Sequence, residues 1–233
     1  MDTTVNNINN INIDDTISYD LPLDRNAVDN GKKAYMIFKR ICDVFIAVCA
    51  LTLLFPLLFV VALVVFIECP KANPIFCQNR IGKDGKRFCF FKFRSMIPDA
   101  EAELEKLLHK NEMEGNAFKI KDDPRITKIG RFLRKTSIDE FPQLLNVIKG
   151  DMSIVGPRPP LEREYKNYSE YEKQRLYVTP GLTCYWQTKP NRNEMTFNEW
   201  VNLDIEYIKD RSVKTDFIII LRTFGAVFGM HGV

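Results

Sequence analysis

The chain has 233 residues, of which 45% are hydrophobic and 27% charged, enough for one folded domain plus a membrane element. Only two histidines occur, so a histidine-based zinc site, a Ser-His-Asp triad or a Cys-His pair is hard to build. The six cysteines include no Cys-x-x-Cys pair, which predicts a reducing compartment and no disulfide framework. The formal net charge is +3, but six aspartates and one arginine fall in the first 30 residues, so the remainder is basic and suits an anionic partner.

Residues 1–31 are rich in Asn and Asp and poor in apolar side chains, which predicts a disordered head. This segment is acidic, and the hydrophobic segment begins far behind it. The head is therefore not expected to be a signal peptide.

Residues 32–70 contain an uncharged apolar run, Val44–Ile67, that is long enough to reach across a bilayer core. Pro56 lies near its middle, where it removes a helical hydrogen bond and kinks the chain. Basic residues flank both ends, whereas a simple spanning helix usually shows a one-sided positive bias. We therefore predict a re-entrant membrane helix hairpin, broken at Pro56, that enters and leaves on the cytoplasmic face. A kinked spanning helix is the alternative that physics alone leaves open.

Residues 71–233 are predicted to form a single cytoplasmic catalytic domain of the α/β class, mostly α with a small β element. Two short runs, Ile75–Gln78 and Arg87–Phe93, flank a glycine-rich turn and predict a hairpin. Pro98–Asn111 has the apolar spacing of an amphipathic helix, and the mostly apolar residues 215–230 predict a membrane-contacting helix.

The stretch Thr136–Pro160 contains the candidate site. Asp139 and Glu140 lie at a predicted helix start, where free amides and the positive end of the helix dipole favour a phosphate, and Gly150 closes that helix. Arg158 lies between two prolines that fix its backbone, and a guanidinium binds phosphate bidentately. One carboxylate can act as nucleophile or metal ligand and the other as a base, provided that Mg²⁺ and arginines offset the repulsion between two anions.

A structural role for the carboxylates is the alternative. Ser137 to Glu140 matches a capping box, in which a hydroxyl and a glutamate three residues later satisfy the first amides of a helix. Pro142 complicates this interpretation because the helix can also begin there.

Several longer motifs resemble those of the bacterial sugar transferase family, the monotopic phosphoglycosyl transferases. The resemblance runs from about residue 39 to the C-terminus, and its middle block is highly specific. The motifs are FKFRSM (91–96), DPRITKIGRFLRKTSIDEFPQLLNVIKGDMSIVGPRP (123–159), TPGLT (179–183), and WQ followed by NRNE (186–194).

The resemblance implies an enzyme that transfers a sugar phosphate from a UDP-sugar to polyprenol (undecaprenyl) phosphate and releases UMP. It implies that Asp139 attacks the β-phosphate and becomes covalently linked to the sugar phosphate, that Glu140 assists, that Mg²⁺ lies beside Asp139, and that Arg158 holds phosphate. It further implies a re-entrant anchor in the bacterial inner membrane, with the catalytic domain on the cytoplasmic face. The other positions that match the family's site are Arg94, Arg125, Thr127, Arg134, Gln187 and Arg192.

The sequence departs from the family in places. Phe55 precedes Pro56 where relatives often have serine, and Cys184 and residues 189–192 replace glycine-containing motifs, so the sugar is not predicted. A non-catalytic membrane scaffold for polysaccharide assembly is the alternative function. We expect a lipid bilayer as partner and no nucleic acid, because the basic span 119–135 lacks the aromatic-plus-basic modules of such binders. A homo-oligomer is compatible with the sequence.

Overall fold

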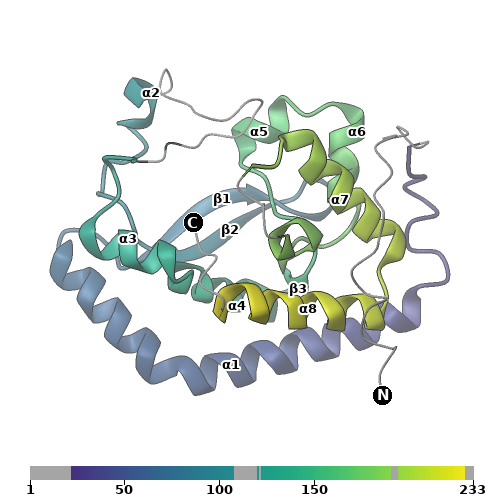
Figure 1. Ribbon diagram of the computed structural model, residues 1–233, viewed down its shortest axis with the longest axis horizontal. Coiled ribbons are helices and arrows are strands. Elements are labelled where there is room, and N and C mark those ends of the chain that lie inside the picture. Colours follow the sequence, from purple (N-terminus) through teal and green to yellow (C-terminus); the bar gives the residue numbers. More distant parts are fainter. Residues whose placement is uncertain (1–21, 108–119, 121, 190–193, 229–233) are drawn as a thin grey trace, which may run out of the picture.

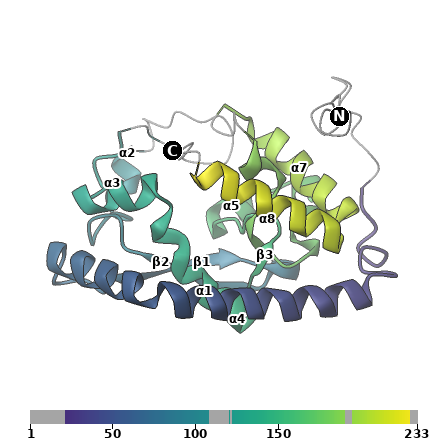
Figure 2. The same ribbon diagram turned by 60° about the horizontal axis from the view of Figure 1, so that its bottom comes forward.

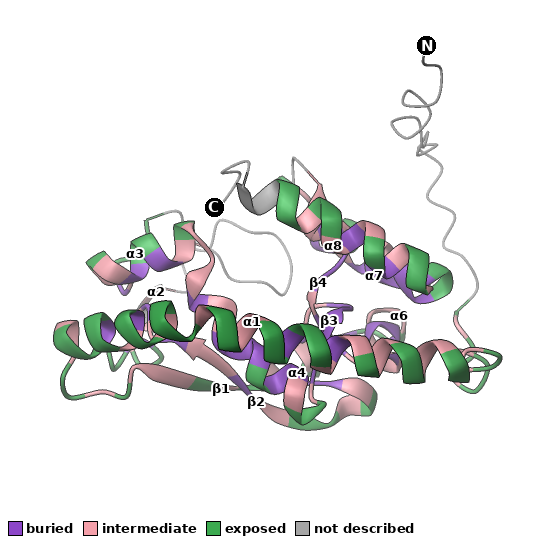
Figure 3. Ribbon diagram, turned by 90° about the horizontal axis from the view of Figure 1, so that it is seen from below, coloured by how far each residue is buried: buried purple, intermediate pink, exposed green. Residues whose placement is uncertain are grey.

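A 36-residue helix, α1 (Lys33–Glu68), runs along one side of the molecule and carries the rest of the chain on its other side (Figures 1 and 2). The computed structural model describes residues 22–107, 120, 122–189 and 194–228. The inward stripe of α1 includes Ala47, Val61 and Val65, which are buried against the domain. Its outward face exposes large apolar side chains such as Phe45 (69%) and Leu53 (80%), and this face is visible from below in Figure 3. By length and composition α1 could cross a membrane.

The predicted break at Pro56 is not found, because α1 continues through this residue as one helix. A proline removes one backbone hydrogen bond and commonly kinks a helix without ending it, and the ribbon of α1 changes direction along its length (Figure 1). The uninterrupted apolar sequence on both sides explains why helix resumes at once.

The disordered head was predicted to extend to residue 31, but residues 22–31 belong to the folded part of the chain. They form turns that pack against the domain. The backbone N–H of Leu23 donates to the side chain of Gln174 at 2.7 Å, and Arg211 donates to the carbonyl of Val28 at 2.6 Å. These long-range contacts hold an otherwise polar segment in place. Residues 1–21 of the predicted head lie outside the described residues.

The predicted β-hairpin is confirmed. Strands β1 (Ile75–Ile81) and β2 (Arg87–Phe93) pair antiparallel, and a short 3₁₀ turn, η1 (Lys83–Gly85), joins them. Asp84 and Gly85 both have positive φ, 57° and 77°, the backbone conformation for which an Asp-Gly pair is suited.

The sequence analysis predicted no disulfide framework, but the structure contains a disulfide. Cys77 on β1 and Cys89 on β2 form a disulfide, with their Cα atoms 5.4 Å apart. They are diagonal neighbours in the hairpin register, since Cys77 pairs with Phe91 and Asn79 with Cys89. Their spacing of twelve residues in the sequence gives no sign of this proximity; only the strand register does.

Among the described residues, the rest of the chain is mostly helical, with one further two-stranded sheet. Strands β3 (Ser153–Val155) and β4 (Gly181–Thr183) pair in parallel at the centre. The predicted class, mostly α with a small β element, is therefore confirmed, while only residues 104–107 of the helix expected over 98–111 are helical among those described. The helices are α2 (Leu104–Leu107), α3 (Lys128–Lys135), η3 (Ile138–Gln143), α4 (Leu144–Lys149), α5 (Glu162–Lys166), α6 (Glu170–Lys173), η4 (Gln174–Tyr177), η5 (Tyr185–Thr188), α7 (Phe197–Asp210) and α8 (Val213–Phe228).

The main hydrophobic core lies between α1, α4, β3, α7 and α8. Ala47 of α1, Val147 of α4, Val155 of β3 and Tyr207 of α7 are all at most 1% exposed. This core ties the start of the apolar helix to the segment that follows the Asp-Glu pair, so the candidate site is held close to α1.

Candidate active site

Asp139 and Glu140 lie in η3, directly before α4. Gly150 ends α4 with φ of 92°, as predicted. The capping-box alternative is wrong, because Ser137 adopts a left-handed backbone (φ 56°) and its side chain makes no capping hydrogen bond. The prediction failed because Pro142 and the tertiary contacts start this segment as a 3₁₀ turn. Glu140 is therefore not engaged as the partner of a helix cap.

Asn146 fixes this segment to the β-hairpin. Its side chain is fully buried, accepts a hydrogen bond from the backbone N–H of Phe91 at 3.0 Å, and donates to the carbonyl of Cys89 at 2.6 Å. The amide thus pairs with β2 as another strand would. This contact sets α4, and with it the Asp-Glu pair, at a defined distance from Lys92.

Cations from three different segments, α3, β2 and β1, interact with the two carboxylates. Asp139 is only 8% exposed, and burial, with a smaller contribution from Glu140, raises its pKa from 3.8 to about 6. The positive charges of Arg134 and Lys92 oppose this rise in the pKa. A carboxylate with a raised pKa in a cationic enclosure is a common feature of functional sites.

Lys92 and Arg80 are cations of this cluster that the sequence analysis missed. Burial, followed by repulsion from Arg80 and Arg134, lowers the pKa of Lys92 to about 8. Burial and the neighbouring Arg158 lower the pKa of Arg80 to about 9. The β2 motif that carries the family resemblance contains Lys92, and alternation along β1 and β2 is the signal that could have indicated both side chains.

Arg80 also supports the loop that carries Arg158. Its guanidinium is buried, donates to the carbonyl of Pro159 at 2.8 Å, and stacks over the ring of Phe90 at 5.0 Å. The backbone N–H of Ile81 donates to the next carbonyl of the loop at 3.0 Å. The end of the rigid Gly-Pro-Arg-Pro turn is thus attached to β1.

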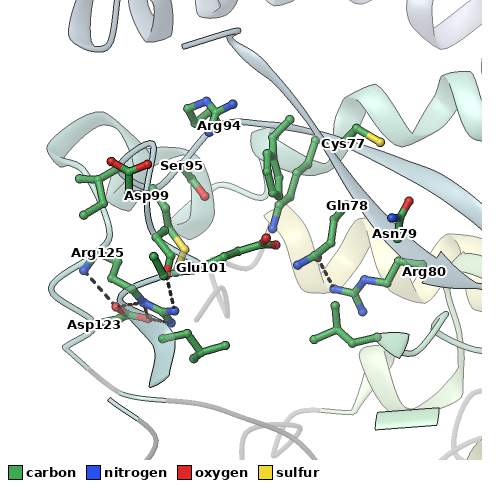
Figure 4. Close-up of a pocket in the computed structure, with 18 of the residues that line it drawn as sticks. Cys77, Gln78, Asn79, Arg80, Arg94, Ser95, Asp99, Glu101, Asp123 and Arg125 are labelled. Atoms are coloured by element: carbon green, nitrogen blue, oxygen red, sulfur yellow. Dashed lines mark hydrogen bonds and ion pairs between the residues drawn. The ribbon is translucent and has the colours of Figure 1, made fainter. Parts of the chain in front are cut away.

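A cavity of about 900 Å³ adjoins this cluster (Figure 4). Its walls come from β1, β2, the segment after β2, the start of α5 and the segment before α3. Lys92 and Arg134, which interact with Asp139, line it together with Arg158, the neighbour of Lys92. Asp139 and Glu140 themselves are not among the residues that line it. The space is large enough for a nucleotide-sized ligand.

The structure brings four of the predicted phosphate-binding arginines to this cavity: Arg94, Arg125, Arg134 and Arg158. Arg94 donates to the carbonyl of Asn73 at 2.9 Å, and Arg134 donates to the hydroxyl of Ser95 at 3.0 Å.

Arg125 is the most constrained of the four. It is buried, pairs with both carboxylate oxygens of Asp123, with a shortest contact of 2.6 Å, and donates to the carbonyl of Ala100 at 3.0 Å. This pairing supports the cavity wall.

The other predicted residues lie elsewhere. Thr127 caps α3, where its hydroxyl accepts from the backbone N–H of Gly130 at 2.9 Å. Gln187 lies on η5, donates to the carbonyl of Leu182 at 3.0 Å, and is not among the residues that line this cavity. Arg192 lies outside the described residues.

Asp139 and Glu140 provide the donors that a magnesium ion prefers. Within the described ranges, no three His, Cys, Asp or Glu side chains gather as a complete metal site. Mg²⁺ does not need one, because it usually takes one or two carboxylates, waters and the phosphates of its substrate. The nearly buried Asp139 beside a second carboxylate fits that mode of binding.

Comparisons with known proteins agree with these features. A family model described as "Bacterial sugar transferase" matches residues 34–230. The chain is 47% identical to "Galactosyl transferase CpsE" of Streptococcus agalactiae serotype III over 196 residues, 84% of this chain and 43% of that protein. It is 37% identical to "Undecaprenyl-phosphate galactose phosphotransferase" of Salmonella typhimurium over 207 residues, 87% of this chain and 43% of that protein.

A shorter relative aligns over most of its length. "Exopolysaccharide production protein ExoY" of Sinorhizobium fredii is 40% identical over 196 residues, 82% of this chain and 85% of that protein. The chain thus spans less than half the length of the first two relatives and most of the third.

Proposed function

Because the chain belongs to the bacterial sugar transferase family, we propose that it transfers a sugar phosphate from a UDP-sugar to polyprenol phosphate and releases UMP. The observation that carries this proposal is the nearly buried Asp139, beside Glu140, whose neighbouring cations Lys92 and Arg134 line a nucleotide-sized cavity. The printed names of the relatives, which include a galactosyl transferase and an undecaprenyl-phosphate galactose phosphotransferase, support the same reaction class.

In the proposed first step, a carboxylate oxygen of Asp139 attacks the β-phosphorus of the UDP-sugar. A bond forms between this oxygen and phosphorus, the bond from phosphorus to the oxygen that bridges the two phosphates breaks, and UMP leaves with the electron pair. Arg134, Lys92 and Arg158 offset the charge on the phosphates, which water-exposed cations would do less effectively. Mg²⁺, held by Asp139 and Glu140, supplies further charge neutralisation at the phosphates when bound.

In the second step, a phosphate oxygen of polyprenol phosphate attacks the same phosphorus and displaces the Asp139 carboxylate. The products are a polyprenyl diphosphate sugar and free enzyme. The first step requires Asp139 in its ionised form, and its raised pKa makes it a better nucleophile than an ordinary carboxylate once it has lost its proton. The second step returns Asp139 to its ionised form as the leaving group.

We further propose that α1 dips into the bacterial inner membrane from its cytoplasmic face, so that both ends of the helix lie on that face. Both ends of the helix are attached to the same domain. Near its start, Asp43 accepts a hydrogen bond from the backbone N–H of Ile154 at 3.1 Å, and at its end Glu68 accepts from the N–H of Ile129 at 3.1 Å. A helix whose two ends lay on opposite sides of a bilayer could not keep both contacts.

The topology can be tested by labelling single cysteines with a membrane-impermeant thiol reagent. Ile37→Cys and Lys71→Cys, each in a background with Cys42, Cys49 and Cys69 replaced by alanine, should label only after the cytoplasmic side is opened. Labelling from opposite sides would refute the re-entrant arrangement.

The reaction can be tested by measuring UMP release from a panel of UDP-sugars in membranes that contain polyprenol phosphate. We expect release that depends on Mg²⁺, is abolished in Asp139→Asn and is strongly reduced in Glu140→Gln. Undiminished UMP release by Asp139→Asn would refute the nucleophile assignment. The absence of release from every donor by the wild-type protein would favour the scaffold function.

A further inference from the structure

The cavity has two chemically different ends, on either side of the cationic cluster. Figure 4 shows Gln78 and Arg80 of β1 at one end and Arg125 with Asp123 at the other. Arg134 adjoins the second end through its bond to Ser95. The first end continues into the start of α5. The second end carries Asp99 and Glu101 in addition to its apolar lining residues, which are Met96, Ile97, Ala100, Leu104 and Ile120.

We infer that the end formed by Gln78 and Glu164 binds the sugar of the UDP-sugar, and that the apolar end takes the uracil ring; this rests on the proposed function. A sugar is covered with hydroxyl groups, each of which loses water on binding and needs a polar partner. Uracil is a planar ring that gains from apolar contact, and a ribose phosphate next to it suits the nearby arginines. Lys92, which neighbours both Arg80 and Arg134 and interacts with Asp139, lies between the two ends, and the β-phosphate must lie beside it if both assignments hold.

Gln78 is held in one orientation by a buried neighbour. Its side-chain oxygen accepts a hydrogen bond from Arg80 at 3.0 Å, which leaves the amide NH₂ pointing toward the cavity (Figure 4). Arg80 is 6% exposed and stacks on Phe90, so it cannot easily move away. A donor fixed in this way can recognise one hydroxyl of a sugar and reject a donor in which that hydroxyl points elsewhere.

Glu164, at the adjoining start of α5, is fixed in a similar manner. One of its carboxylate oxygens accepts from the backbone N–H of Leu161 at 2.8 Å, at the start of α5. The same carboxylate lies close enough to Arg80 to affect its pKa, so Gln78, Arg80 and Glu164 form one connected group. A carboxylate is a strong acceptor for neutral hydroxyls, whereas it would repel a diphosphate.

The experiment compares the donor with two inhibitors that lack the sugar, using the full-length protein in membranes. UDP retains both phosphates, and UMP retains only the nucleotide. For Gln78→Met we expect kcat/KM for the best UDP-sugar to fall about tenfold, the effect of one lost hydrogen bond, while Ki for UDP and UMP stays unchanged. The matched variant at the other end, Ile97→Ala, should raise Ki for UMP and UDP together with KM for the donor.

Unchanged inhibition by UDP also shows that the variant is folded and that the cationic cluster is intact. Glu164→Gln, which keeps an oxygen for the Leu161 N–H, provides a second test of the same end and should show the same pattern. The assignment is overturned if Gln78→Met weakens UDP or UMP as much as it lowers kcat/KM, or if neither variant affects the donor. A wild-type protein that releases UMP from no UDP-sugar would instead refute the proposed function itself.

Discussion

Replacing Asp139 by asparagine should stabilise the protein at neutral pH while it removes activity. Burial raises the pKa of this carboxyl from 3.8 to about 6 in the folded protein, so the folded state binds the proton more tightly than the unfolded state. The ionised form therefore destabilises the fold above pH 6, and this cost disappears as the pH falls from 6 to about 4. A shift of two units corresponds to about 3 kcal/mol, an upper limit for the gain in Asp139→Asn.

The gain can be measured by thermal unfolding of detergent-solubilised protein in EDTA between pH 4 and pH 8. The stacked pair Trp186 and Trp200, with ring centroids 4.7 Å apart, provides a fluorescence signal from inside the domain. At pH 7 the melting temperature of Asp139→Asn should exceed that of wild type by roughly 6–12 °C, and the two should converge near pH 4. Asp99→Asn, at an exposed position of the cavity wall, is the control and should change little.

The addition of Mg²⁺ at pH 7 should raise the melting temperature of wild type and leave that of Asp139→Asn unaffected, since the metal neutralises the carboxylate. A variant that is less stable than wild type at pH 7 would refute the reasoning, because it would show that the Asp139 carboxylate is already fully compensated in the folded protein.

Two further predictions concern the walls of the site. Because Lys92 has a pKa of about 8, wild-type kcat/KM for UMP release should fall above that pH as the side chain loses its charge. Lys92→Arg stays charged, so its kcat/KM should hold up to pH 9.5. Parallel pH profiles of the two proteins would show that the reaction does not depend on this charge. Gly130→Ala places a methyl group against the backbone carbonyl of Ser95, so it should cost about 1–3 kcal/mol in chemical unfolding. Gly225→Ala, with no atom within 4 Å of the added methyl group, should be neutral or slightly stabilising.

Local sequence signals predicted the parts of the fold that local chemistry decides. The Asp84-Gly85 pair specifies a turn with positive φ, and the hairpin formed as expected. Gly150 ended its helix for the same reason. Arg158 could be expected near the carboxylates because its loop follows them closely in the chain, and it lines the cavity beside Lys92.

Features that depend on burial and register were not readable from the sequence. Ser137 and Glu140 have the spacing of a capping box, yet the backbone at Ser137 is left-handed. Tertiary packing therefore overrides the local propensity here. A lone lysine in a strand, such as Lys92, is usually solvated, and its role appears only when burial and four neighbouring charges are known. The Cys77–Cys89 bond likewise requires the strand register.

Asn146 shows how the two halves of the site depend on one another. In the sequence it is one polar residue in the helix that follows the carboxylates, with no sign of a function. In the fold its amide replaces a missing strand partner of β2, between the backbone groups of Cys89 and Phe91. Since Lys92 is the next residue of β2, the same two hydrogen bonds that complete the sheet edge also fix the spacing between a cation and the carboxylate of Asp139 that it faces. One side chain therefore contributes both to the stability of the hairpin and to the electrostatics of the site.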